Sequence, residues 1–465
     1  MRQRSDEISY KVLSARAIWL AAAVTLLSGV GIAVWLLTSY GSGGDQQRNQ
    51  LDAIRTAGTI VVGTGGAAAL LLAARKQRTA EITLKQKERD QADVARTHEL
   101  QERVALANEE DAAQRRITEL YTKAVEQLGS TQAVVRLGGL YALERLAEEY
   151  KTHRKTIVNV LCAYLRMPFT PPLQSAPLVD SQQELQARLT AQRILVKHLR
   201  PSEIFWEGSS LDLSDATLVG WDMRDCVVHD AIFPRARFIG DTSFTGIQVA
   251  GSADFTESTF TGDSWFSEAA FIGAGNFEQA TFEGDAYFDS ATFPTDASFD
   301  NALFAHTASF RQSVFAGTSW FCETSFTGRA IFESAEFRGI AAFNDAVFTG
   351  SASFIQANFH LIAGFGDTLF HSHVQFSRAR FGHHAWFRMA RFGRTTSFDL
   401  AVFAADLWLA GAAFSDDVWF RITTLAGEAS FENASFASRP DFSTVRLRRH
   451  EGNRTVWPVS PSADR

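Results

Sequence analysis

Phenylalanines in the second half of the chain recur at alternating steps of five and six residues, without a break from Phe255 to Phe403. The chain has 38 phenylalanines but only 7 tyrosines, and 36 of the phenylalanines lie after position 230. Neither the 3.6-residue period of a helix nor the two-residue period of a plain strand produces this rhythm. It predicts a backbone that turns regularly every five or six residues.

A second position follows the same rhythm. Two residues before each large residue there is usually Ala, Ser, Thr or Gly, as at Ala253, Ser258 and Ser264. Residues two apart in extended backbone point the same way, so each large residue and its small partner should share one buried face. Short extended pieces that each bury such a pair predict a solenoid of stacked coils.

The repeat resembles that of the pentapeptide-repeat family, roughly Ala-(Asp/Asn)-(Leu/Phe)-x-x, which "ADF" at 253–255 and "ANF" at 357–359 match. The resemblance covers residues 211–449 and implies a right-handed quadrilateral β-helix with four repeats per coil. The chain departs from the family because every second repeat has an extra residue, which gives 22 residues per coil. We therefore predict wider corners on two opposite sides, some 11 coils, and phenylalanine columns at about 4.8 Å spacing.

Two uncharged stretches, residues 17–38 and 56–74, predict a transmembrane helical hairpin, since about 20 apolar residues span a bilayer. A cleaved signal peptide is the alternative for the first stretch, but its apolar run is too long and no small-x-small site follows. Basic residues gather in residues 1–16 and after residue 74. This asymmetry predicts a multi-pass cell-membrane protein with both termini cytoplasmic and residues 39–55 as an external loop.

The sequence between membrane and repeats is helical in pattern. Residues 75–166 predict a solvated stalk followed by a packed helical module, 167–180 a Pro-rich linker, and 181–200 a capping helix. The stretch "AVEQLGSTQAVVRLGGLYALERLAEEY" resembles a helical segment that precedes the repeats in many membrane-attached bacterial pentapeptide-repeat proteins. That likeness implies no particular function for it. A polar tail, 450–465, ends the chain.

No catalytic, cofactor or metal motif appears in the sequence. Three separated cysteines predict reduced thiols and a cytoplasmic setting. Five histidines cluster between His360 and His384, but only His360 with His383 or His384 would share a side on adjacent coils, so exposed histidines are the simpler interpretation. We predict a protein without enzymatic activity, cofactor or metal.

Charge is distributed unevenly along the repeats. Residues 241–367 contain 16 acidic and 3 basic side chains, whereas 371–394 contain five arginines and no acid. The family resemblance permits one function for the acidic stretch, mimicry of a DNA duplex that occupies a type II topoisomerase. A solvated rod surface is the simpler interpretation, and the net charge of -7 makes nucleic acid an unlikely partner.

Five tryptophans stand immediately before an inward residue and are predicted to point outward: Trp265, Trp320, Trp386, Trp408 and Trp419. Exposed aromatic side chains beside arginines are typical of an interaction surface, although they could also cover the wider corners. The candidate docking surface comprises Trp320, Trp386, Trp408, Arg378, Arg388 and Arg391. The predicted function is a membrane-anchored, cytoplasmic protein-interaction scaffold, whose partner and oligomeric state the sequence does not identify.

Overall fold

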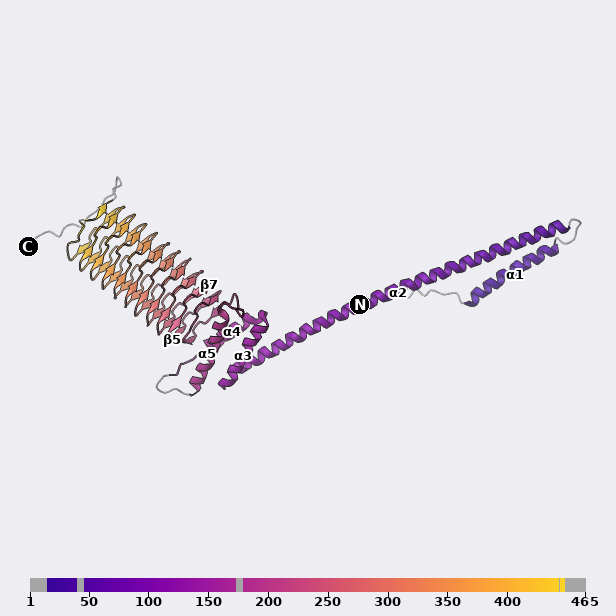
Figure 1. Ribbon diagram of the computed structural model, residues 1–465, viewed down its shortest axis with the longest axis horizontal. Coiled ribbons are helices and arrows are strands. Elements are labelled where there is room, and N and C mark those ends of the chain that lie inside the picture. The colour runs from indigo at the N-terminus through magenta and orange to yellow at the C-terminus, as the bar shows by residue number, and fades with distance from the viewer. Residues whose placement is uncertain (1–14, 40–45, 173–178, 443, 448–465) are drawn as a thin grey trace, which may run out of the picture. The chain divides into compact units, whose positions relative to one another are not determined.

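A computed structural model describes residues 15–39, 46–172, 179–442 and 444–447 (Figure 1). The chain divides into two compact units, residues 1–113 and 114–465. The first unit contains helix α1 (Ala15–Ser39) and most of helix α2 (Gln46–Leu128). The polar tail 450–465 lies outside the described residues.

One helix in the described part of the chain, Asp52–Leu128, is by length and composition apolar enough to cross a membrane. It contains the second predicted span, and α1 contains the first. The prediction of a loop over 39–55 was wrong from Gln46 onward, where the backbone is already helical. Residues 46–55 contain neither Gly nor Pro, so no helix-breaking residue interrupts the helix before the apolar stretch.

Helix α2 changes character along its length. Residues 76–116 are exposed on all sides, in agreement with a solvated stalk, and Ile117 is the first of the buried positions that follow. From there α2 packs with α3 (Ala133–Glu149), α4 (Arg154–Arg166) and α5 (Val179–Leu199) around a shared apolar core. A short 3-10 turn, Lys151–His153, joins α3 to α4.

The helical module lies against the first coils of the repeat region (Figure 1). Arg166 on α4 contacts Asp212 through Nη1 and Oδ2 at 2.6 Å, and Gln192 on α5 donates to the Val219 carbonyl at 3.1 Å. The apolar core of the helical module is continuous with that of the repeats, because one cluster of buried residues runs from Ile117 to Phe431. The helices thus cover the sheet ends at the start of the solenoid, where strands would otherwise expose apolar side chains.

The described repeat region forms four parallel sheets. We name them A to D in the order in which the chain visits them. Sheet A runs from β1 (Leu211–Asp212) through β4 (Ala231–Ile232) to β40 (Ala429–Ser430), and sheet B from β2 (Thr217–Val219) to β41 (Ser435–Phe436). Sheet C runs from β6 (Thr242–Ser243) to β38 (Val418–Trp419), and sheet D from β3 (Val227–Val228) to β42 (Arg446–Leu447). Sheets A, B and D have 11 strands each, and sheet C has nine.

The register confirms the predicted coil length and the number of coils. Paired residues such as Phe282 and Phe304 are 22 positions apart, whereas the first coil is shorter and pairs Leu211 with Ala231. Phenylalanines stack in columns: Phe343 lies 4.9 Å from Phe365, with rings 2° from parallel. Rings from opposite sheets meet edge to face across the core, as Phe343 of sheet A does with Phe332 of sheet C at 5.3 Å. The hand of the coils stays a prediction.

The two kinds of corner have different backbones. Five-residue steps, from sheet A to B and from C to D, turn through a residue with positive φ every 11 positions, such as Glu257 at 56° and Glu268 at 59°. Six-residue steps, from B to C and from D to A, form the predicted wider corners. There a Cβ added to Gly339 would overlap the carbonyl oxygen of Gly317 one coil earlier. A side chain at Gly339 would therefore displace the neighbouring coil.

Candidate functional site

The outward tryptophans gather on two sheets. Trp320, Trp386 and Trp408 occupy the same outward position in β20 (Ser319–Trp320), β32 (Ala385–Trp386) and β36 (Leu407–Trp408) of sheet A. Trp386 pairs in register with Trp408, and each is 42 % exposed. Trp265 and Trp419 lie on sheet C. Indole surface on this scale remains available to a partner.

The predicted arginines separate into two groups. Arg388 follows the inward Phe387 on sheet A, and Arg391 points outward on the adjacent strand of sheet B, β33 (Arg391–Phe392). These two lie on either side of the A–B corner beside Trp386. Arg378 lies at the opposite corner, between sheets C and D, with φ of 60°. The structure therefore brings five of the six predicted residues to sheets A and B and leaves Arg378 apart.

We call the outward face of sheet A together with its corner to sheet B the A–B edge. Acidic residues form a stripe along it, with at least one carboxylate in each of six successive coils: Asp254, Glu257, Glu278, Asp300, Glu323, Asp345 and Asp367. No described arginine, lysine or histidine forms an ion pair with this stripe. At about 4.8 Å per coil the corner positions from Glu257 to Asp367 extend over roughly 24 Å.

Asp300 shows the electrostatic cost of this arrangement. Burial raises the pKa of Asp300, the hydrogen bond from the Cys322 amide at 2.7 Å opposes that shift, and the negative charges of Glu278 and Glu323 add to it. Like charges in successive coils repel one another, and no ion pair among the described residues involves Asp300, Glu278 or Glu323. Such a stripe favours a positively charged ligand or partner segment.

Apolar corner residues next to this stripe were missed by the sequence analysis. Met389 stands at the A–B corner after Asp367, and its thioether lies against Gly411 one coil later. It has φ of 59° and is 45 % exposed. The 11-residue spacing of the corner positions could have shown it, because earlier corners carry polar residues at the same place. The A–B edge therefore changes from acidic to aromatic, apolar and cationic near residue 386.

The histidines do not converge on a metal site. His383 and His384 contact each other edge to face at 4.2 Å, and Nδ1 of His384 lies 3.3 Å from Oδ2 of Asp406. His360 instead contacts its own strand neighbour Asn358 at 2.9 Å. None of them belongs to the single group of three potential metal ligands found among the described residues.

That group lies in the helical module and comprises Glu144, Glu148 and His198. Lys197 Nζ already lies 2.7 Å from Oε1 of Glu144 and 3.5 Å from Oε1 of Glu148, so an ammonium occupies the position of a cation. Burial by itself would raise the pKa of Glu144, but hydrogen bonds from Lys197 and His198 lower it. His198 also stacks on Trp206 at 4.1 Å. The cluster ties α5 to α3 rather than offering an open metal site.

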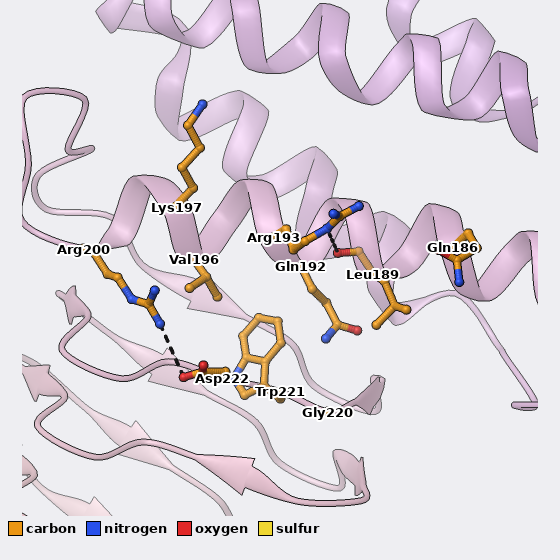
Figure 2. Close-up of a pocket in the computed structure, with 10 residues that line it drawn as sticks. All are labelled: Gln186, Leu189, Gln192, Arg193, Val196, Lys197, Arg200, Gly220, Trp221 and Asp222. Atoms are coloured by element: carbon orange, nitrogen blue, oxygen red, sulfur yellow. Dashed lines mark hydrogen bonds and ion pairs between the residues drawn. The ribbon is translucent and has the colours of Figure 1, made fainter.

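A cavity of about 510 Å³ lies between α5 and the first coil (Figure 2). Figure 2 shows Trp221 beneath α5 and Arg200 reaching Asp222, at 3.4 Å between Nη2 and Oδ1. Arg193 donates to Leu189 and Thr190 of its own helix. Arg193 and Arg200 in this cavity already have hydrogen-bond partners within the chain. We therefore interpret the cavity as part of the junction between the helical module and the solenoid.

The three cysteines offer no activated nucleophile. All are free thiols, and burial raises the pKa of Cys162 and Cys226 to about 12 and that of Cys322 to about 11. A thiol with such a pKa is protonated at neutral pH and reacts slowly.

Fold and surface together define a repeat protein in which a rigid β-solenoid displays side chains at fixed 22-residue intervals. A family model for pentapeptide repeats matches residues 233–281, 244–292, 273–314 and 332–380. The chain is a pentapeptide-repeat protein. No curated protein and no solved structure matches it.

Proposed function

We propose that the chain is a membrane-anchored scaffold whose A–B edge binds another protein. One observation carries the proposal: Trp386, Trp408, Met389 and Arg388 share one exposed surface on a rigid sheet, at the end of a stripe of unpaired carboxylates. Aromatic side chains and arginine dominate the energetic centres of protein interfaces. A surface held by stacked coils also loses little conformational entropy when a partner binds.

Membrane attachment is the second part of the proposal. We place spans at 17–38 and 56–74, with both termini in the cytoplasm. The close approach of α1 and α2 supports a hairpin, because a Cβ added to Gly29 would lie 3.6 Å from Cγ2 of Val61. Small residues at such positions are typical of packed transmembrane helices.

Labelling of intact cells tests this topology. A membrane-impermeant maleimide should label a cysteine introduced at Gln47, between the spans, but not one introduced at Gln279 on the solenoid. Labelling at Gln279 in sealed cells would contradict a cytoplasmic solenoid, and permeabilised cells provide the control for reactivity.

Purification of the full-length protein from membranes in mild detergent tests the scaffold function. Bound proteins would be identified by mass spectrometry for the native chain and for a Trp386→Ala/Trp408→Ala variant. We expect the recovery of one partner to fall in the variant relative to the native chain. Trp265→Ala removes an outward tryptophan from sheet C and is the matched control, which should retain the partner. A partner retained equally in all three would refute docking at the A–B edge.

DNA mimicry is the second candidate function, and the acidic stripe favours it. A line of carboxylates at about 4.8 Å intervals along a rod offers a topoisomerase the kind of regular negative charge that a DNA strand carries. A Glu323→Gln/Asp345→Asn/Asp367→Asn variant removes the stripe from three of its six coils. If topoisomerase subunits copurify with the native chain and not with this variant, while Glu268→Gln on the C–D corner retains them, DNA mimicry replaces the scaffold function.

A further inference from the structure

One four-residue surface motif occurs twice on the solenoid. "WFRM" covers residues 386–389 and "WFRI" covers 419–422. In both, the tryptophan points outward from a strand, the phenylalanine is buried, the arginine is exposed, and the last residue takes a positive φ at a five-residue corner. Exposed fractions agree closely, at 42 % and 37 % for the tryptophans and 45 % and 43 % for Met389 and Ile422.

The two copies lie on opposite edges of the rod. They are 33 residues apart, which is one and a half coils of 22 residues. The first copy belongs to sheet A and its corner to sheet B, and the second belongs to sheet C and its corner to sheet D, which we call the C–D edge. A half-turn about the rod axis and a shift of roughly 7 Å along it therefore relate the copies.

The last residue of each copy has a positive φ, a backbone conformation that is unfavourable for an L-residue with a side chain. An L-residue in this conformation costs about 1–2 kcal/mol, and a β-branched residue such as Ile422 is a clear outlier there. From Asp215 to Arg378 every non-glycine residue with positive φ in the solenoid is polar, and Met389, Leu400 and Ile422 follow. Stability and solubility both disfavour exposed apolar side chains at these corners. A binding role accounts for them.

The arginines of the two copies differ in their contacts with neighbouring side chains. Arg421 lies over the Trp419 ring at 4.7 Å and donates through Nε to Asp399 at 3.0 Å. The equivalent position for Arg388, one coil earlier, is Gly366, and no described carboxylate pairs with Arg388. The A–B copy thus keeps a free cation, whereas a partner at the C–D copy must compete with Asp399.

We propose that the rod binds two copies of one partner, one at each motif. The inference rests on the proposed scaffold function and specifies its partner. Each motif presents an indole ring and a thioether or aliphatic side chain beside a guanidinium. Such a surface is complementary to an apolar side chain that lies next to a carboxylate. The partner is therefore a protein segment with an aromatic or aliphatic residue adjacent to Asp or Glu. Occupancy is tighter at the A–B edge, where Arg388 is free.

Site-specific photocrosslinking in cells tests the proposal with the full-length chain. A benzophenone amino acid replaces Met389 or Ile422, and Gln279 and Gln356 serve as matched controls because they occupy polar corners of the same two edges. We expect the same polypeptide at both test positions and neither control. Trp386→Ala should abolish only the Met389 adduct, and Trp419→Ala only the Ile422 adduct. Native mass spectrometry of the purified complex should give two partners per chain.

Each of the other outcomes would refute the paired sites, docking at these edges or the identity of the partner. Capture at Met389 alone, or of different proteins at the two positions, refutes the paired sites and leaves the scaffold function standing. Capture at neither position refutes docking at these edges altogether. An adduct of twice the chain mass identifies a second copy as the occupant and refutes a separate partner. Equal capture at the control positions shows a nonspecific surface and also refutes the proposal.

Discussion

Phe343→Ala should unfold the solenoid locally rather than along its whole length. The ring of Phe343 is fully buried and stacks on Phe321 at 4.8 Å and on Phe365 at 4.9 Å, with edge-to-face neighbours in the next columns. Truncating a buried phenylalanine costs about 3–5 kcal/mol through lost transfer energy and the cavity that remains. Coils contact only their neighbours, so the cost falls on the coils around residues 321–365.

Phe343→Leu is the matched control, because the same column carries Leu409 naturally at an equally buried position. Leucine retains most of the buried volume but loses the ring pairs, which are worth about 0.5–1.5 kcal/mol each. We therefore expect a loss of about 1–3 kcal/mol from the two stacked contacts. The difference between the two variants separates cavity formation from ring stacking.

Amide hydrogen exchange followed by mass spectrometry on the detergent-solubilised chain measures both effects coil by coil. Protection should fall most in peptides within 321–365 and be unchanged in the first coils under the helical module. A uniform loss of protection from residue 211 to residue 436 would refute the nearest-neighbour reasoning. Phe436→Ala at the end of sheet B should cost less, since that ring is only partly buried and has one stacked neighbour, Phe414.

Three further substitutions test corners and charges. Gly339→Ala should destabilise the chain by about 1–3 kcal/mol in chemical denaturation, because the new Cβ overlaps the Gly317 carbonyl. Ile422→Asn should raise the unfolding free energy by about 1 kcal/mol by relieving a β-branched residue at φ of 57°, while weakening crosslinking at the C–D edge. Glu144→Gln should lower the melting temperature at neutral pH. The effect of this substitution should vanish at low pH. The depressed pKa of Glu144 contributes stability that is present above a pH of about 4.5 and is lost as the pH falls through the pKa of the folded state.

Sequence spacing predicted most of the solenoid because one residue pair per repeat carries the core. The alternation of five and six residues predicted the wider corners, and together with the four repeats per coil that the family resemblance implies it predicted the coil length and the ring stacking. Such features need no knowledge of distant contacts.

Surface features were harder to predict because they depend on which residues align across coils. Arg378 and Arg388 are ten residues apart in sequence but lie at opposite corners, so sequence proximity was misleading. The alignment of Glu257 with Glu323 becomes visible only once four repeats per coil are established. Charge counts gave the acidic stretch, but not its concentration on one edge.

The two ends of the A–B edge suggest how a partner would be oriented. A carboxylate stripe that ends at Asp367 attracts positive charge over about 24 Å, and the free guanidinium of Arg388 attracts negative charge only one coil further on. A partner segment with a basic residue near Asp367 followed by an acidic one near Arg388 can satisfy both in a single direction, whereas the reverse orientation places like charges together. Electrostatics of this kind fixes register and speeds association more than it strengthens binding. High salt should therefore slow association at the A–B edge, while dissociation, governed by Trp386 and Met389, changes little.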